Sequence, residues 1–351
     1  MFLKYLSLQN FRSYKKADFS FSHNTTLIVG PNTSGKTNLI EAIYLLSEGK
    51  SFRIEKDENM VQFGEKIARV KGITNENELE AVIAGREFTS NGRIVKKYLV
   101  NGVAKKRSDF IGNLPCVLFS PVDLEIIIGS PGTRRNFLDH ILSQTDRDYR
   151  LYLASYEKGL RLRNAVLHKI KEQGVRQDRE LEYWDEILIK NGQFISKKRE
   201  DIIGYFNSNQ KDVFDFVVFY DKSVISKERL LQYKDVEVGA GVTLVGPHRD
   251  DFFVSMFDEN LKTTHDMRFF GSRGQQRLAV LQLKILELTL VKKMMGDSLL
   301  ILDDIFSELD SGHINLVLDM IGKQQTIITT THKEFIPSQI LKDIDMIELG
   351  K

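Results

Sequence analysis

The chain contains 351 residues, enough for about two domains of ordinary size. Its composition, with 42% hydrophobic and 28% charged residues, is typical of globular proteins and excludes a disordered, collagen-like or disulfide-rich chain. Its 50 Lys and Arg residues nearly balance 48 Asp and Glu residues, so the net charge of +2 indicates no partner. A surface for nucleic acid would have to come from local basic clusters.

Few features of the sequence indicate where in the cell the protein is located, and they agree with one another. The single cysteine, Cys116, cannot form an internal disulfide and fits a reducing compartment. The first residues lack the apolar stretch of a signal peptide, and no 18 apolar residues follow one another. We therefore expect a soluble, cytoplasmic protein.

The first third of the chain predicts strands around one helix. Period-two alternation indicates strands near Leu6 and Phe19, and residues 25–29 form a β-rich run that ends at Gly30. Apolar residues spaced as on one helical face predict a helix over 38–46. The residue pattern again predicts strands over 67–103, where the Asn-Gly dipeptides at 91–92 and 101–102 are typical of tight hairpins.

The middle of the chain predicts helices. From about residue 133 to 208 strand signals vanish, and Gly174 and Gly192 are expected to separate several Arg- and Lys-rich helices. Strands are expected again at 213–220 and 252–257, then a helix over 278–295 and a strand–helix–strand region from 299. The prediction is a discontinuous α/β domain over 1–120 and 235–351, with a mainly helical lobe inserted at 121–234.

Residues 30–37 match the phosphate-loop pattern G-x-x-x-x-G-K-[ST]. Its glycines let backbone N–H groups surround phosphates, Lys36 reaches the β- and γ-oxygens, and the Thr37 hydroxyl can ligate Mg²⁺. The strand before the loop and the helix after it are the context that the motif requires. The sequence therefore predicts a nucleotide site.

An apolar run at 299–302 ends in Asp303 and Asp304, which describes a buried parallel strand with carboxylates at its C-terminal edge. Asp303 would hold Mg²⁺ directly or through water. Asp304 would deprotonate the attacking water or only position it. Most of the chain separates Lys36 from this pair, which agrees with a large insertion.

A third motif opens the helix near residue 278. Ser272, Gly274 and Gln275 form a Ser-x-Gly-Gln turn whose N–H groups and hydroxyl suit a phosphate. Since one nucleotide does not need two such cradles from one chain, this turn is interpreted as serving the nucleotide of a second copy, so that two copies enclose two ATP molecules.

With these three motifs, the chain resembles the ATP-binding-cassette heads of the structural-maintenance-of-chromosomes and Rad-fifty type, and more narrowly the RecF family of bacterial recombination mediators. The stretches that carry the narrower resemblance span nearly the whole chain: residues 8–12, 37–44, 51–53, 119–124, 129–139, 163–167, 246–251 and 272–277. One departure is Thr33, where the family more often has a small residue.

The resemblance implies an ABC-type P-loop ATPase head with a β-rich N-terminal part and an inserted, mostly α-helical lobe. It assigns roles to three groups of residues. The nucleotide and Mg²⁺ would be bound by Gly30, Asn32, Ser34, Gly35, Lys36, Thr37, Asn38 and Asp303, and the catalytic residues would be Lys36 and Asp304, which serves the attacking water. Ser272, Gly274, Gln275 and Asp310 would reach the nucleotide of the other subunit. Gln62 or His332 would sense the γ-phosphate, although both match the family pattern loosely.

The resemblance also implies a function. ATP and Mg²⁺ would join two heads on double-stranded or gapped DNA, and slow, DNA-stimulated hydrolysis would release it. RecR and RecO would be partners in loading RecA at single-strand gaps, with roles in replication restart and SOS induction. Four basic clusters could face DNA or could simply be solvated; the candidates taken from three of them are Arg134, Arg135, Arg161, Arg163, Lys197, Lys198 and Arg199.

Two other functions share the cassette chemistry. A nucleotide-binding subunit of a membrane transporter would need a groove for a membrane partner, and the long basic insertion argues against it. A chromosome-tethering protein would need long coiled coils, for which the insertion is too short and lacks heptads.

Overall fold

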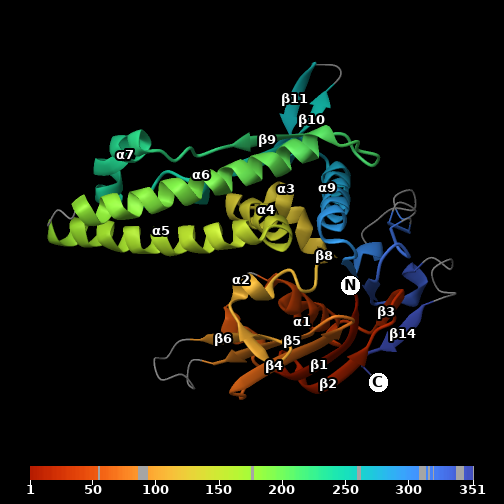
Figure 1. Cartoon of the computed structure of the whole chain (residues 1–351). Coiled ribbons are helices and arrows are strands. Elements are labelled where there is room, and N and C mark those ends of the chain that lie inside the picture. Colours follow the sequence, from red (N-terminus) through yellow and green to blue (C-terminus); the bar gives the residue numbers. More distant parts are fainter. Residues whose placement is uncertain are drawn as a thin grey trace. The chain divides into compact units, whose positions relative to one another are not determined.

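The computed structural model describes residues 1–53, 56–85, 94–174, 178–258, 262–307, 314, 317–318, 320–336 and 344–350. It divides into two compact units, one made of residues 1–123 and 284–351 and the other of residues 124–283 (Figure 1). Both ends of the chain therefore belong to the first unit.

A five-stranded parallel sheet lies at the centre of the first unit, in the order β14-β3-β13-β12-β8. Its strands are β3 (Thr25–Val29), β8 (Cys116–Phe119), β12 (Leu299–Asp303), β13 (Thr326–Thr330) and β14 (Asp345–Glu348). Every residue of β12 and β13 is buried, which explains why the sequence shows apolar runs there instead of alternation. Figure 1 shows β3, from the start of the chain, beside β14, from its end.

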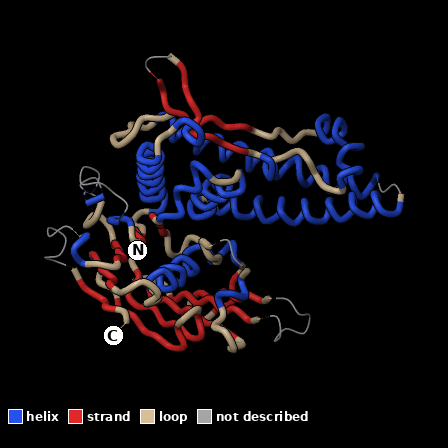
Figure 2. Tube along the Cα trace, turned by 180° about the vertical axis from the view of Figure 1, so that it is seen from behind, coloured by secondary structure: helices blue, strands red, loops and turns tan. Residues whose placement is uncertain are grey.

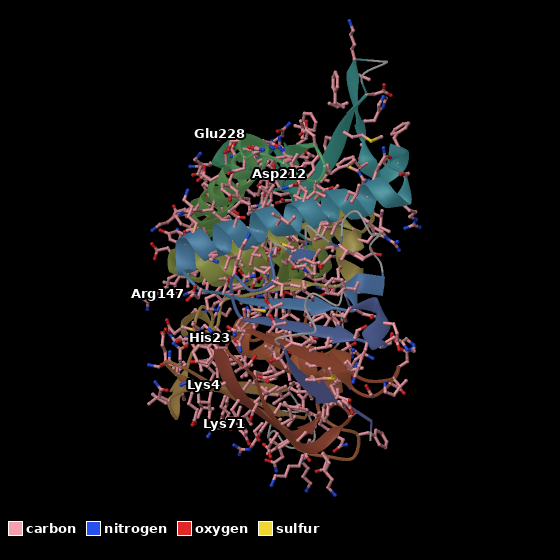
Figure 3. All side chains as sticks on the ribbon, turned by 90° about the vertical axis from the view of Figure 1, so that its right-hand side faces the viewer. Lys4, His23, Lys71, Arg147, Asp212 and Glu228 are labelled. Carbon is pink, nitrogen blue, oxygen red and sulfur yellow. The ribbon has the colours of Figure 1, made fainter. Side chains whose placement is uncertain are left out.

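The second sheet of this unit is antiparallel, in the order β2-β1-β4-β5-β6-β7. Its strands are β1 (Leu3–Phe11), β2 (Tyr14–Ser20), β4 (Ile67–Thr74), β5 (Glu78–Ala84), β6 (Val95–Val100) and β7 (Val103–Lys105). Side chains alternate between core and solvent, and Figure 3 labels Lys4 and Lys71 of this sheet. Asn101 and Gly102 form the predicted hairpin with φ angles of 51° and 75°, whereas the hairpin predicted at 91–92 lies outside the described residues.

Helix α1 (Lys36–Glu48) follows β3, and its apolar residues join those of both sheets in one core. Short helices complete the unit: η1 (Asp57–Met60), α2 (Arg107–Phe110), η5 (Ile305–Ser307) and η6 (Lys333–Phe335), with η3 (Pro121–Leu124) at its edge.

The second unit is mainly helical, and its long helices α5 and α6 run side by side in both Figure 1 and Figure 2. Its helices are α3 (Glu125–Ile128), α4 (Pro131–Thr145), α5 (Arg147–Gln173), α6 (Asp178–Ser208), α7 (Lys227–Ala240), η4 (Pro247–Arg249) and α8 (Met267–Phe270). An antiparallel sheet, β11-β10-β9, consists of β9 (Val217–Asp221), β10 (Asp251–Asp258) and β11 (Thr263–Asp266).

The two glycines expected to separate helices behave differently. Gly174 ends α5 with a φ of 66°, as predicted. Gly192 lies inside α6, so the predicted break there is wrong. A Cβ at Gly192 would lie 2.8 Å from Ile225 Cγ2 and 3.1 Å from Pro247 Cδ, so glycine at this position allows close packing.

The second boundary between the units differs from the one drawn from the sequence. It falls at 283–284, inside α9 (Arg273–Met295), and not at 234–235. The reason is sheet pairing: β10 pairs with β9 on one side and with β11 on the other, which keeps residues after 235 in the second unit. In the described part of the chain, no helix is long and apolar enough to cross a membrane.

Candidate functional site

The loop between β3 and α1 has the backbone that a phosphate loop needs. Gly35 precedes α1 with a φ of 101°, a conformation that side chains strongly disfavour. A Cβ there would also lie 2.7 Å from the hydroxyl oxygen of Tyr14, which donates a hydrogen bond to the Gly35 carbonyl at 3.1 Å. Both the positive φ angle and the neighbouring tyrosine therefore require glycine at this position.

Thr33 has an unusual backbone conformation for a residue with a side chain. Its φ of 72° lies in the left-handed region, which a β-branched side chain rarely adopts. Threonine in this conformation costs about 1–2 kcal/mol of local strain.

The Lys36 side chain points back into the loop. Its ammonium donates hydrogen bonds to the carbonyls of Gly30 at 2.6 Å and Pro31 at 3.0 Å, and the residue is 8% exposed. Burial lowers the pKa of Lys36, and the charges of Asp304 and Asp303 oppose that shift. The ammonium is thus held where the oxygens of a bound phosphate could replace the carbonyls.

The two acids lie where β12 ends. Asp303 is 6% exposed, and the Thr329 hydroxyl donates a hydrogen bond to its Oδ1 at 2.6 Å. Burial raises the pKa of Asp303 and of Asp304, while Lys36 draws the pKa of Asp304 down. Asp304 has a φ of 53°, so the chain leaves the strand in a left-handed conformation.

These groups surround one cavity of about 340 Å³. Its lining consists of Asn32, Thr33, Gly35, Lys36, Thr37, Asn38, Arg53, Pro121, Asp303 and Asp304. The structure thus brings together Lys36, Thr37 and the acid pair, which lie more than 260 residues apart in the sequence. Gly30 and Ser34 belong to the loop but do not line this cavity.

The donor set fits magnesium. Mg²⁺ in phosphate sites is held by one or two carboxylates together with substrate phosphates, and the Thr37 hydroxyl and Asp303 carboxylate are such hard oxygen donors. No group of three His, Cys, Asp or Glu side chains among the described residues forms a self-sufficient metal cage. A cation here would therefore depend on phosphates and water for its remaining ligands.

Arg53 is a cavity residue that the sequence analysis did not select. Its guanidinium donates to Asn38 Oδ1 at 3.2 Å and lies 3.5 Å from a carboxylate oxygen of Glu41. Glu41 is fully buried in α1 and also binds Arg12 through two hydrogen bonds of 2.8 and 2.6 Å. The sequence feature that could have identified it is the stretch 51–53, which contributed to the family resemblance although no role was assigned to Arg53.

The two candidates for a γ-phosphate sensor are placed differently. Gln62 does not line the cavity, and its backbone N–H bonds the Asn10 carbonyl at 2.8 Å. His332 follows β13, is largely exposed, and lies near enough to Asp304 for its charged form to lower the pKa of that carboxyl. His332 therefore interacts with an acid of the cavity.

The Ser-x-Gly-Gln turn lies in the second unit, at the start of α9. The Ser272 N–H donates to Gln275 Oε1 at 2.8 Å, and the Gln275 N–H donates to the Ser272 hydroxyl at 3.3 Å. This reciprocal pair caps the helix. A Cβ at Gly274 would meet no described atom within 4 Å. Asp310, the remaining residue assigned to the other subunit's nucleotide, lies outside the described residues.

Three of the candidate DNA-binding residues are buried. Arg134 binds Asp251, Arg163 binds Asp185, and Arg199 binds Asp139, each with at least one contact of 2.6–2.8 Å and each residue no more than 2% exposed. Their charges are thus paired with acids inside the second unit, which argues against direct contact with DNA. The interpretation of these three arginines as surface residues is therefore corrected.

The other four candidates reach solvent to different degrees. Arg161 is exposed on α5. Lys197 pairs with Asp201 at 2.8 Å on the surface of α6, and Lys198 pairs with Asp146 at 2.6 Å. Arg135 is partly buried and donates to the Asp250 carbonyl at 2.7 Å.

Comparison with known proteins agrees with this fold. Residues 2–346 match the family described as RecF/RecN/SMC N terminal domain. The chain is 36% identical to the DNA replication and repair protein RecF of Agathobacter rectalis, over 98% of this chain and 96% of that protein. It is 38% identical to RecF of Clostridium botulinum, over 97% and 96% of the two chains.

A solved structure is similar as well. The recombination mediator protein RecF with ATP, described as part of the RecFOR pathway, superimposes with a TM-score of 0.83 at 32% identity, covering 95% of this chain and 93% of that chain. The predicted fold class, a P-loop ATPase head with a β-rich N-terminal part and an inserted helical lobe, is confirmed. The chain therefore belongs to the RecF family within the RecF/RecN/SMC group.

Proposed function

We propose that this chain is an ATP-dependent DNA-binding protein of recombinational DNA repair and a slow, DNA-stimulated ATPase. The observation that carries the proposal is the cavity that Lys36, Thr37, Asp303 and Asp304 line together. The similarity of the whole chain to a RecF structure solved with ATP supports ATP as the nucleotide.

Each side chain of the cavity has a role in this proposal. Lys36 exchanges its bonds to the Gly30 and Pro31 carbonyls for bonds to the β- and γ-phosphates. Thr37 and Asp303 hold the magnesium ion, which would neutralise charge on the phosphates. Asp304 accepts a proton from the attacking water or orients that water, and burial, which raises its pKa, favours acceptance.

A second copy of the chain would complete the site. Ser272 and Gln275 satisfy each other in the free chain, and their polar groups lie at the N-terminus of α9, which attracts phosphate. A Cβ at Gly274 would meet no described atom within 4 Å, so the space beside this residue is open to a partner's nucleotide. Asp310 would contact the opposing phosphate loop.

The closed dimer would hold double-stranded or gapped DNA in the cytoplasm and release it on hydrolysis. Arg161, Lys197 and Lys198 are exposed or half-exposed basic residues of the helical unit that could contact DNA phosphates, with Arg135 as a partly buried fourth. The names of the relatives support a place in repair and replication. RecR and RecO would be its partners in loading RecA. Replication restart and SOS induction would follow from that role.

The test combines gel filtration with DNA retention, each with and without ATP and Mg²⁺. The wild-type chain should form dimers and retain DNA only with both. Lys36→Met should abolish both effects because nucleotide binding is lost. Ser272→Arg should bind nucleotide normally and fail to dimerise, since its added bulk lies only at the proposed interface. ATP-independent DNA retention that Lys36→Met leaves unchanged would refute the switch.

A further inference from the structure

One hydroxyl group connects the two acids of the cavity. Thr329 Oγ1 donates to Asp303 Oδ1 at 2.6 Å, and the backbone N–H of Asp304 donates to the same Oγ1 at 3.1 Å. The Asp304 N–H is also 3.2 Å from the Thr329 carbonyl oxygen. Thr329 thus contacts the side chain of one acid and the backbone of the next.

The direction of these bonds follows from the single proton of the hydroxyl. Because the Asp304 N–H already donates to Oγ1, the threonine proton must be donated elsewhere, and Asp303 Oδ1 receives it. Holding one carboxylate oxygen fixes the direction of the other. The hydroxyl therefore constrains the rotation of the Asp303 carboxylate.

The position of Thr329 in the sheet supports this role. Its strand β13 lies between β3, which leads into the phosphate loop, and β12, which leads into the acids. Thr329 pairs in register with Asp303 and with Ile28, and it is fully buried. Asp304 needs such support because its φ of 53° is unfavourable for a residue with a side chain.

We propose that Thr329 is a positioning residue, which sets the Asp303 carboxylate for a magnesium ion and holds the Asp304 backbone in its left-handed conformation. This inference rests on the proposed ATP-binding function. Groups that orient metal ligands are commonly worth a 10–100-fold change in metal affinity or activity. Thr329 should therefore affect binding of the metal much more than binding of the nucleotide alone.

The test uses Thr329→Val, which keeps the branched shape and removes the hydroxyl. Binding of a fluorescent ATP analogue to the full-length chain is measured in EDTA and then across a range of Mg²⁺ concentrations. In EDTA the variant should bind as the wild type does. The Mg²⁺ concentration at half-effect should rise about tenfold or more, and Thr329→Ser should restore most of this loss.

Thr326→Val is the matched control. Thr326 is equally buried, at the other end of the same strand, and its hydroxyl donates to the Gln324 carbonyl at 3.1 Å, away from the acids. It should show the wild-type Mg²⁺ dependence. If the valine variant does not fold, Thr329→Cys, with a weaker donor, should still raise the half-effect concentration several-fold.

Two results would overturn the inference. One is an unchanged Mg²⁺ dependence in Thr329→Val, or in Thr329→Cys if only that variant folds. The other is an equal loss of nucleotide binding in EDTA and in Mg²⁺, which would assign Thr329 a general structural role. A wild-type chain that binds no ATP analogue at any Mg²⁺ concentration would instead contradict the proposed function.

Discussion

Replacing Arg163 with methionine separates a structural role from a DNA-contacting role. Arg163 joins three helices or loops of the second unit: its guanidinium donates to Asp185 at 2.6 Å and to Thr243 Oγ1 at 2.8 Å. It also lies 2.7 Å from a carboxylate oxygen of Glu237 in α7. The methionine variant keeps much of the apolar volume and removes all of these contacts.

The magnitude follows from the burial of Glu237, which is 0% exposed. Without Arg163, this carboxylate loses its counter-ion inside the unit, and breaking a buried pair in this way costs about 3–5 kcal/mol. For a unit of this size each kcal/mol shifts the unfolding midpoint by about 2–4 °C, so the midpoint should fall by about 6–20 °C.

Trp184 makes the assay specific to this unit. It is the only tryptophan of the chain, and it lies in α6 against the buried cluster Val166, Leu167, Ile170 and Leu181. Its fluorescence during thermal unfolding therefore reports the helical unit.

Two further variants control the interpretation. Arg161→Met, two positions away on the exposed surface of α5, should change stability by less than about 0.5 kcal/mol. Adding Glu237→Gln to Arg163→Met should recover part of the loss, because the buried charge is then removed. The reasoning is refuted if Arg163→Met unfolds at the wild-type temperature and loses DNA retention.

Three other predictions concern the acid pair, the glycine of the turn and the partly buried His248. Asp304→Asn should keep nucleotide binding and lower the rate of phosphate release about 100-fold or more in single-turnover measurements, since a proton acceptor is lost; unchanged turnover would reassign the base. Gly274→Ala should not lower thermal stability, because the added methyl group meets open space, yet it should weaken ATP-dependent dimers in gel filtration; normal dimers would show that no partner approaches this site. Burial lowers the pKa of His248 to about 4 from 6.5, so the unfolded chain takes up this proton first, and the stability reported by Trp184 should decrease as the pH falls from about 6.5 towards 4. His248→Gln should flatten that part of the pH profile, and an identical slope in both proteins would contradict the assignment.

The phosphate loop and the acid strand could be predicted because their chemistry is local. A strand, a short glycine-containing turn and a helix are encoded within about a dozen residues, and the apolar run before Asp303 marks a strand buried on both faces. Arg53 could not be selected in the same way. Its place in the cavity depends on Glu41, whose burial and contact with Arg12 arise only when β1 packs beside α1.

The buried arginines illustrate the same limit in the helical unit. An arginine in an amphipathic helix has the same local pattern whether it faces solvent or an acid from another segment. The partners of Arg163 lie 22 to 80 residues further along the chain, and those of Arg199 lie up to 60 residues away. Spacing within one helix contains no information about such partners, so Arg161 and Arg163 looked alike in the sequence.

Two of the six described non-glycine residues with positive φ angles line the cavity. Thr33 and Asp304 line the cavity from opposite ends of the chain, and both have positive φ angles although neither is glycine. Such conformations persist where surrounding contacts fix them. For Asp304 those contacts are the carbonyl and hydroxyl of Thr329, which also holds Asp303. A change that relaxes the backbone at Asp303 and Asp304 should therefore disturb both acids together. Variants at Thr329 and Asp304 should then be non-additive in a double-mutant cycle that measures nucleotide hydrolysis.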